Sequence, residues 1–504
     1  MISLTSKRIT FIAFILTFII SCSPSESPQY DVIIRGGSIY DGLGGNPIIG
    51  DIGIHNDQIS FIGNLKNNTA KTNIDASGLA VAPGFINMLS WATETLIEDG
   101  RAMSDVLQGV TLEIMGEGSS MGPWNNAMKV NELKSQGDIK FDIEWTTLGE
   151  YLEYLENRGV SVNVASFVGA TTLRIHEVGY EDREATSVEI QNMQDLVHQA
   201  MQEGAMGVGS SLIYAPGNFA STKELISLVQ VAAEYGGTYI SHIRSEGSQL
   251  EEAVNELIKI ASITGAPAEI YHLKASGKTN WHKLSNVFEM IEGARSAGLL
   301  ISADMYTYPA GSTGLDAAMP LWVQEGGHDA WVERLKKPEI RQRVMDEMLK
   351  PSNEWENFYL DAGPENILLA GFKNPDLRHL TGKTLLEIAN ERGTEPAITA
   401  MDLVIEDNSR VNTIYFLMSE ENVKRKIKQP WMSFGSDGSA PAQEGLFLEQ
   451  NVHPRAYGNF SRLLGKYVRD EKVISLQEAI RKLTSLPAAN LGIYKRGQLK
   501  ADFF

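Results

Sequence analysis

The sequence contains a single cysteine among 504 residues. One cysteine cannot close an internal disulfide, and it cannot supply the several thiolates of a structural zinc cluster. Basic residues are also scarce, with 44 Lys and Arg against 63 Asp and Glu, which gives a formal net charge of −19. Because binding to phosphate backbones depends on clustered positive charge, we expect no nucleic-acid partner.

The most marked apolar run stands near the N-terminus. Lys7 and Arg8 precede a run from Ile9 to Ile20, which is shorter than the ~20 residues that a membrane-spanning helix needs. A basic start followed by such a run is typical of a secretory signal peptide. The stretch Phe18-Ile-Ile-Ser-Cys22 resembles a bacterial lipobox, in which the cysteine is lipidated and becomes the mature N-terminus.

These features predict a lipoprotein signal peptide over residues 1–22 and lipidation of Cys22. The alternative is an ordinary cleaved signal peptide in which the cysteine is coincidental. A flexible Ser- and Pro-rich tether follows Cys22, and Ser23 resembles the choice made for outer-membrane sorting. We therefore expect an exported bacterial lipoprotein, facing the periplasm or attached to the outer membrane, whose lipid anchor makes its membrane contact.

The rest of the chain has the composition of a large globular protein, with 43 % hydrophobic and 21 % charged residues. Between residues 30 and 81, short apolar runs alternate with Gly- and Asn-rich turns. Four or five strands at this spacing predict that residues 23–82 form the N-terminal part of a small β-sandwich domain.

From about residue 85 the pattern changes to apolar strands that alternate with amphipathic helices. Three strands end at His242, His272 and Asp304, at intervals of about 30 residues, which is the length of one βα unit. This pattern predicts an α/β fold, a (β/α)8 TIM-type barrel over residues 83–490. Residues 318–385 break the pattern and predict a helical insertion, which acts either as a lid or as an elaborated loop without a gating role.

Two of the nine histidines close consecutive strands at matching positions. His242 ends Ile240-Ser-His and His272 ends Ile270-Tyr-His, so imidazoles from neighbouring strand ends can converge on one metal ion. Each histidine alone could equally be a structural hydrogen-bonding group. Asp437, in Phe434-Gly-Ser-Asp-Gly, follows another apolar run and is a candidate general base, although an aspartate before glycine is also common in turns.

Several further motifs occur in a fixed order along the chain: Asp31-Val-Ile-Ile-Arg-Gly-Gly, Pro83-Gly-Phe-Ile, Gly109-Val-Thr, Ser241-His-Ile-Arg-Ser-Glu-Gly, Gly435-Ser-Asp-Gly, His453-Pro-Arg-Ala-Tyr-Gly-Asn-Phe and Thr484-Ser-Leu-Pro-Ala-Ala-Asn-Leu-Gly. Taken together, these motifs resemble the amidohydrolase superfamily, and within it the N-acyl-D-amino-acid deacylase (D-aminoacylase) branch. The resemblance extends from Tyr30 to the end. It implies a barrel beside a small β domain, a bound zinc ion and hydrolysis of an amide bond.

The resemblance also implies roles for individual residues. His242 and His272 would be zinc ligands, and Asp437 would be the base that activates water and then protonates the leaving amine. Residues at positions that hold the substrate carboxylate or the scissile carbonyl would be Lys274, Tyr306, Ser312 and Arg455.

The chain departs from the family pattern at the first strand. The superfamily usually has a His-x-His pair just after Pro-Gly-Phe-Ile, whereas this chain has Leu89 and Trp91 at those positions. Neither side chain can ligate zinc, so we expect one zinc ion per chain and no second metal held by such a pair.

The second departure is a missing cysteine ligand on the second strand. The corresponding stretch, Leu112-Glu-Ile-Met-Gly-Glu-Gly, contains no cysteine. Our candidate replacement is Glu117, because carboxylate oxygens also bind zinc, although the resemblance places the cysteine nearer Gly118. Glu113 lies on the same face of the strand but deeper, and Glu117 could instead only orient a ligand or cap a helix.

The leading functional hypothesis is a zinc-dependent amide hydrolase that removes the acyl group from N-acyl-D-amino acids or cleaves small D-residue peptides. One alternative is a hydrolase of cyclic amides or isoaspartyl peptides on the same scaffold. Another is a catalytically impaired, amidohydrolase-like binding lipoprotein. Residues 491–504 are expected to begin a return to the small β domain, where the family layout includes further strands.

Overall fold

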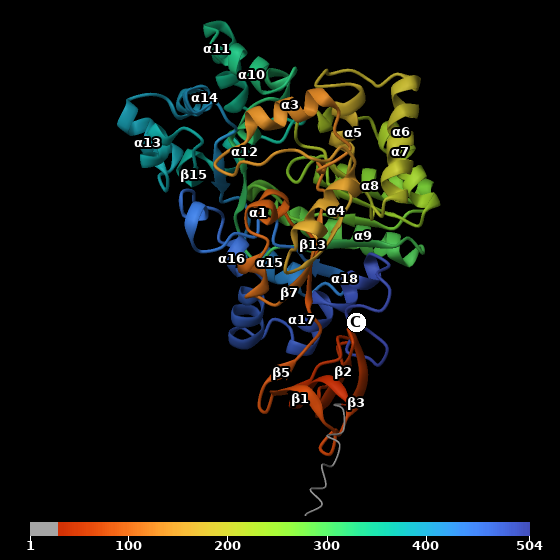
Figure 1. Cartoon of the computed structure of the whole chain (residues 1–504). Helices are drawn as coiled ribbons and strands as arrows, with labels where there is room; N and C mark the ends of the chain where they lie inside the picture. The colour runs from red at the N-terminus through yellow and green to blue at the C-terminus, as the bar shows by residue number, and fades with distance from the viewer. Residues whose placement is uncertain (1–28) are drawn as a thin grey trace, which may run out of the picture.

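The structure is a computed structural model that describes residues 29–504. A small sheet lies at one end of the molecule, a barrel occupies the middle, and an inserted unit covers one side of the barrel at the other end (Figure 1). The predicted signal peptide and the predicted lipidation site Cys22 fall outside the described residues. Within them, no helix combines the length and the apolar character needed to span a bilayer.

Five strands form the small sheet: β1 Tyr30–Ile39, β2 Ile48–His55, β3 Gln58–Gly63, β4 Ala70–Asp75 and β5 Ala80–Val81. Strand β1 pairs antiparallel with β2 and parallel with β4 and β5. Ile39, Ile52 and Ile59 form its buried core. The end of the chain returns to this sheet, since the carbonyl of Phe503 accepts a hydrogen bond from the amide of Ile59 at 2.8 Å.

The barrel consists of parallel strands that pair in chain order around a closed ring. They are β6 Phe85–Asn87, β7 Val110–Met115, β8 Asn163–Ser166 with its continuation β9 Val168–Gly169, β10 Gly207–Ser211, β11 Thr238–His242, β12 Ala268–Ile270, β13 Ile301–Met305 and β17 Met432–Phe434. The ring closes between β17 and β6, where the amide of Met88 donates to the carbonyl of Phe434 at 3.1 Å. The expected TIM-type barrel is therefore present.

Helices surround this ring, and most of them bury an apolar side, although α3 buries no residue (Figure 1). Between β6 and β13 the helices are α1 Thr93–Glu98, α2 Met103–Val106, α3 Asn126–Ser135, α4 Leu148–Arg158, α5 Ala170–Glu177, α6 Ser187–Gln202, α7 Thr222–Glu234, α8 Leu250–Thr264 and α9 Leu284–Ser296. After β17 come α16 Arg455–Arg462, α17 Leu476–Leu483 and α18 Ser485–Asn490. Several begin with strong capping signals, such as the reciprocal Thr186–Glu189 capping box that opens α6.

The inserted unit is larger than predicted and is not purely helical. It contains helices α10 His328–Leu335, α11 Pro338–Met348, α12 Phe358–Ala362, α13 Leu385–Arg392 and α14 Pro396–Asp407. It also contains an antiparallel sheet of β14 Gly311–Gly314, β16 Asn412–Tyr415 and β15 Ile367–Gly371. The expected bounds 318–385 missed β14 because its sequence, Gly-Ser-Thr-Gly, has no apolar residue and is extended only through pairing with β16. Helix α15 Glu420–Ile427 then leads back to the barrel.

Candidate active site

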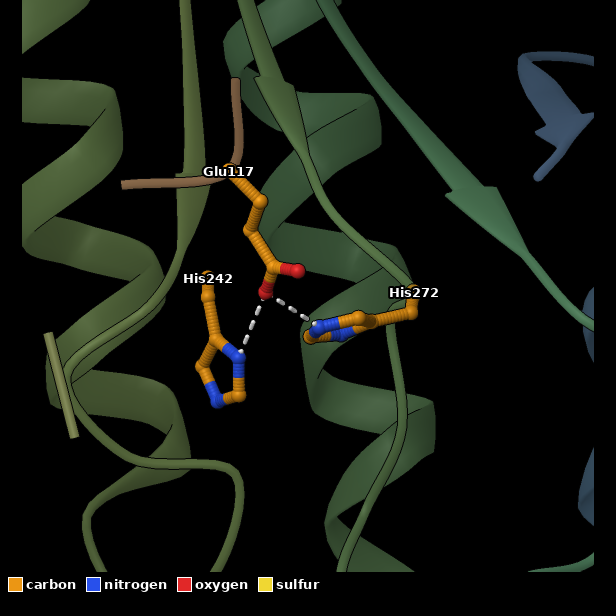
Figure 2. A group of neighbouring side chains, drawn as sticks. All are labelled: Glu117, His242 and His272. Atoms are coloured by element: carbon orange, nitrogen blue, oxygen red, sulfur yellow. Dashed lines mark hydrogen bonds and ion pairs between the residues drawn. The ribbon is translucent and has the colours of Figure 1, made fainter. Parts of the chain in front are cut away.

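Three buried side chains meet at the carboxyl end of the barrel. Glu117 follows β7, His242 is the last residue of β11, and His272 follows β12. Oε1 of Glu117 lies 2.9 Å from Nδ1 of His242 and 2.9 Å from Nε2 of His272. Figure 2 shows the carboxylate reaching between the two imidazole rings. Parallel barrels place strand ends together in this way, which is why distant parts of the sequence meet here.

The donor set of this cluster suits a zinc ion. All three side chains are at least 95 % buried, with exposures of 5 % for Glu117, 4 % for His242 and 3 % for His272. One ligand atom from each lies within 4.8 Å of the others. Two imidazoles with one carboxylate form a known set for catalytic zinc, which leaves a coordination position for water or substrate. The residues present therefore fit the metal that the motifs imply.

The backbone around the cluster is strained and anchored. His272 and Asp437 both adopt a left-handed conformation, with φ of +35° and +48°. Such angles are uncommon outside glycine and concentrate at functional sites. The amide of His272 donates to Oδ1 of Asp304 at 2.9 Å, and this bond fixes the turn that aims the imidazole inward.

A second carboxylate, Glu246, contacts the other nitrogen of each ring. Its Oε1 lies 3.0 Å from Nδ1 of His272, and its Oε2 lies 3.6 Å from Nε2 of His242. Lys274 also donates to Glu246. Carboxylates in this position fix the orientation of ligating histidines. The sequence motif contained Glu246 without assigning it a role, and its spacing of four residues from His242 was the available signal.

The electrostatics of the cluster favour a positive charge. Burial opposes ionisation of Glu117, but the two histidines nevertheless hold the pKa of its carboxyl well below its usual range. Burial and Lys274 lower the pKa of His272, whereas Glu246 and Glu117 raise it more strongly, so that it reaches about 10. Two carboxylates thus surround two imidazoles and create a site that attracts a proton or a metal cation.

Asp437 and Arg455 form an ion pair beside the cluster. Asp437 follows β17 and Arg455 opens α16, and Nη1 of the arginine lies 2.8 Å from Oδ2 of the aspartate. Burial raises the pKa of Asp437, although Arg455 opposes the shift. Arg455 is only 4 % exposed, and its Nε group lacks a hydrogen-bond acceptor. An unsatisfied buried donor of this kind marks a place for an anionic ligand.

The remaining predicted substrate-binding residues line the same cavity, whose volume is about 550 Å³. The ring of Tyr306 lies beneath the guanidinium of Arg455, with 4.6 Å between the guanidinium carbon and the ring centre. The hydroxyl of Ser312 donates to the carbonyl of Thr413 at 3.1 Å, and the Ser312 carbonyl accepts from Arg455 at 3.2 Å. Ser312 therefore contacts Arg455 through its backbone rather than through its side chain.

The structure separates the two candidate carboxylates on β7. Glu113 is fully buried within the barrel, where its Oε2 accepts from the side chain of Asn87 at 2.8 Å. It does not belong to the cluster of potential ligands, whereas Glu117 does. Side-chain direction alternates along a strand, so both residues face inward, but only Glu117 lies at the level of the histidines.

Trp91 has a role that the sequence did not suggest. Its indole Nε1 donates to Oε2 of Glu117 at 3.0 Å, while Oε1 of the same carboxylate faces the histidines. The sequence predicted only that Trp91 is not a ligand. Trp91 lies four residues beyond the end of β6, outside the strand, so side-chain alternation gave no signal for this contact.

Comparisons with known proteins agree with this geometry. No protein-family model matches the sequence. A D-aminoacylase of Alcaligenes xylosoxydans xylosoxydans is 31 % identical over 486 residues, covering 96 % of this chain and 88 % of the relative. The chain belongs to the D-aminoacylase family of amidohydrolases. This confirms both the resemblance inferred from the motifs and the fold class.

Solved structures of the family extend the comparison. The crystal structure of an N-acyl-D-glutamate deacylase from Bordetella bronchiseptica, complexed with zinc and a phosphonate inhibitor, has a TM-score of 0.77 at 29 % identity, covering 94 % of this chain and 88 % of the other. A D-aminoacylase described as having a binuclear metal centre, with one-metal activation and second-metal attenuation, has a TM-score of 0.76 at 30 % identity, with the same coverage. The roles of individual residues in this chain stay predictions.

Proposed function

We propose that this protein is a zinc-dependent hydrolase that removes the acyl group from N-acyl-D-amino acids. The observation that carries the proposal is the meeting of Glu117, His242 and His272 in the cavity that also contains Asp437 and Arg455. A three-ligand cation site, a buried acid and an arginine with a free Nε donor are the parts that hydrolysis of an acylated amino acid requires. Membership of the D-aminoacylase family supports the same reaction.

Arg455 binds and orients the substrate. An N-acyl amino acid carries a free carboxylate, to which the unsatisfied Nε–H group of Arg455 can donate a charge-assisted hydrogen bond. Tyr306 supports the guanidinium from below, and Lys274 lies near the same ring, with 5.6 Å from its Nζ to the ring centre. These contacts hold the amide bond above the three-residue cluster.

Asp437 moves the proton. Its carboxylate oxygen takes a proton from the attacking water as the new carbon–oxygen bond forms, and then delivers it to the amide nitrogen as the carbon–nitrogen bond breaks. The products are the free acid and the D-amino acid. Bound zinc supplies Lewis-acid stabilisation of the negative charge that develops during attack. Burial raises the pKa of Asp437, which suits a group that must both accept and return a proton.

We also propose that the site holds one cation. Leu89 and Trp91 stand at the positions of the usual His-x-His pair, and neither offers a lone pair to a metal. Trp91 presents an N–H donor to Oε2 of Glu117, the carboxylate oxygen that does not face the histidines. A second cation beside this oxygen would therefore face a hydrogen-bond donor.

Metal analysis combined with an activity assay tests the proposed function. We expect about one zinc per chain and release of free D-methionine from N-acetyl-D-methionine. The variant His272→Ala should lose both zinc and activity, because it removes one of the three ligands. The matched control is His282→Ala, an exposed histidine outside the cavity lining, which should retain both. A metal-free, inactive wild-type protein would instead indicate a binding protein without turnover.

Export and lipidation complete the proposal. A basic start, an apolar run to Ile20 and the following Cys22 support an exported lipoprotein, facing the periplasm or attached to the outer membrane. Radiolabelled palmitate should enter the wild-type protein and should not enter the variant Cys22→Ser. Labelling of both proteins, or of neither, would refute the assignment.

A further inference from the structure

A second arginine lies on the rim of the cavity, on the side of His242. Tyr214 stacks edge-to-face against His242, with 5.4 Å between the ring centres. The guanidinium carbon of Arg410 lies 5.1 Å from the centre of the Tyr214 ring. Arg410 is therefore one aromatic ring away from the cation cluster and lines the same cavity.

Strand β14 connects this arginine to Arg455. The carbonyl of Ser312 accepts a hydrogen bond from Arg455, and the hydroxyl of Thr313 accepts one from Arg410 at 3.2 Å. Both guanidinium groups thus contact neighbouring residues of one strand. A substrate whose carboxylate lies on Arg455 would bring its side chain along the same edge of the cavity.

The two guanidinium groups differ in what neutralises them. Arg410 pairs with Oδ2 of Asp316 at 2.7 Å, and Asp316 is almost fully buried, with a side-chain exposure of 7 %. Oδ1 of Asp316 has no hydrogen-bond partner, while the side chain of Arg410 is 54 % exposed and lines the cavity. The buried carboxylate therefore places its negative charge directly beside the more exposed guanidinium. Arg455 also pairs with a carboxylate, that of Asp437, but its buried Nε group has no acceptor. Arg455 thus keeps one donor available for an anion.

Besides the two arginines, the cavity offers little positive charge to an acidic side chain. Lys274, the lysine of the cavity, is paired with Glu246. Burial lowers the pKa of His453 to about 2, so this imidazole is neutral and supplies no positive charge. The nearby walls include the rings of Tyr214, Trp331 and Phe358. Apolar and aromatic groups of this kind bind uncharged side chains.

We propose that the site selects N-acyl-D-amino acids whose side chain is uncharged, and that Asp316 sets this selectivity by neutralising Arg410. The inference rests on the proposed function and adds the substrate class. An acidic side chain that reached Arg410 would also lie near the buried carboxylate of Asp316, and the two negative charges would repel each other. Asp316 acts through Arg410 and is a specificity-determining residue, not a catalytic one.

The test compares kcat/KM for N-acetyl-D-methionine and N-acetyl-D-glutamate. In the wild-type protein we expect D-methionine to be favoured by at least about tenfold. The variant Asp316→Asn should raise kcat/KM for N-acetyl-D-glutamate by about tenfold and leave the D-methionine value within about twofold, because it frees the charge of Arg410. The double variant Asp316→Asn with Arg410→Gln should lose this gain, since it removes the cation as well.

A matched control separates selectivity from a general loss of stability. Asp402 pairs with Arg341 at 2.6 Å in the same inserted unit but does not line the cavity. The variant Asp402→Asn removes an equivalent ion pair and should leave the substrate preference unchanged. A wild-type protein that prefers N-acetyl-D-glutamate would overturn the proposal, as would an Asp316→Asn variant whose preference does not move.

The outcome can also be distinguished from failure of the proposed function. If the zinc-loaded protein hydrolyses neither compound, both remain intact and their dissociation constants can be measured by calorimetry. Binding of N-acetyl-D-methionine that is tighter than binding of N-acetyl-D-glutamate, with a smaller difference between the two in Asp316→Asn, would support the selectivity. The absence of turnover would at the same time refute hydrolysis. Equal or tighter binding of N-acetyl-D-glutamate, or no binding of either compound, would overturn the selectivity itself.

Discussion

Replacement of Trp91 by phenylalanine tests whether the indole N–H holds the proposed metal ligand. The variant Trp91→Phe keeps an aromatic ring at the end of β6 but removes the hydrogen bond of 3.0 Å to Oε2 of Glu117. Without this bond the carboxylate can rotate, so that Oε1 no longer faces the two histidines in a single orientation. We expect weaker zinc binding with little change in fold.

The magnitude follows from the geometry of this bond. A hydrogen bond to a charged group contributes about 1.5–3 kcal/mol. Trp91 is 38 % exposed, and solvent screens the interaction, so the lower end applies. A loss of about 1.5 kcal/mol corresponds to roughly a tenfold increase in the dissociation constant for zinc. This agrees with the effect expected when a group that orients a metal ligand is removed.

Competition with a chromophoric chelator measures the zinc affinity, and thermal unfolding of the zinc-free protein measures the fold. The matched control is Trp322→Phe, because Nε1 of Trp322 donates to Oε2 of Glu347 at 2.8 Å in the inserted unit. This variant should retain wild-type zinc affinity. An unchanged affinity in Trp91→Phe would refute the reasoning, and so would an equal loss in both variants.

Three further predictions concern the substrate, the pH and the backbone. Arg455→Lys should raise KM for N-acetyl-D-methionine about tenfold in steady-state kinetics, because an ammonium cannot make the paired contacts of a guanidinium; an unchanged KM would contradict the role of Arg455. Burial lowers the pKa of Lys482 from 10.5 to about 7, so at pH values between these two the lysine is protonated in the unfolded chain and neutral in the folded protein. The free energy of unfolding should therefore rise with pH in this window, by up to about 1.4 kcal/mol per pH unit more in the wild-type protein than in the variant Lys482→Met. Urea titrations at pH 7.5 and 9 measure this difference, and an equal dependence on pH in both proteins would contradict the prediction. Gly116→Ala should destabilise the protein by about 3 kcal/mol, because φ is +105° and the new Cβ would lie 2.4 Å from the carbonyl oxygen of Phe167. Gly159→Ala, at φ +80° with no atom near the new Cβ, should cost about 1 kcal/mol. Equal losses of stability in denaturant unfolding would refute the steric argument.

The barrel and its site were largely predictable from local pattern. Strands that end at His242, His272 and Asp304 recur at the interval of a βα unit, and the carboxyl ends of parallel strands must meet at one edge. Polar residues at those ends were therefore expected to converge. The absence of ligating residues at Leu89 and Trp91 could be read directly from the sequence.

Contacts between distant segments were not predictable in the same way. Depth along the second strand favoured Glu117 over Glu113 already in the sequence, but its contact with Trp91 was not predictable. The inserted sheet was missed because β14, Gly-Ser-Thr-Gly, has no strand pattern of its own. The pairing of Arg410 with Asp316 joins residues nearly one hundred positions apart, and no local signal connects them.

The sequence by itself determined which chemical groups the protein has and on which repeating units they lie, because strand and helix patterns are set by neighbouring residues. Only the tertiary structure decided which oxygen of Glu117 faces the histidines, which donor holds the other oxygen, and which of two arginines remains available to an anion. These outcomes depend on distances of about 3 Å between side chains from separate segments, and such distances are fixed by packing rather than by local sequence.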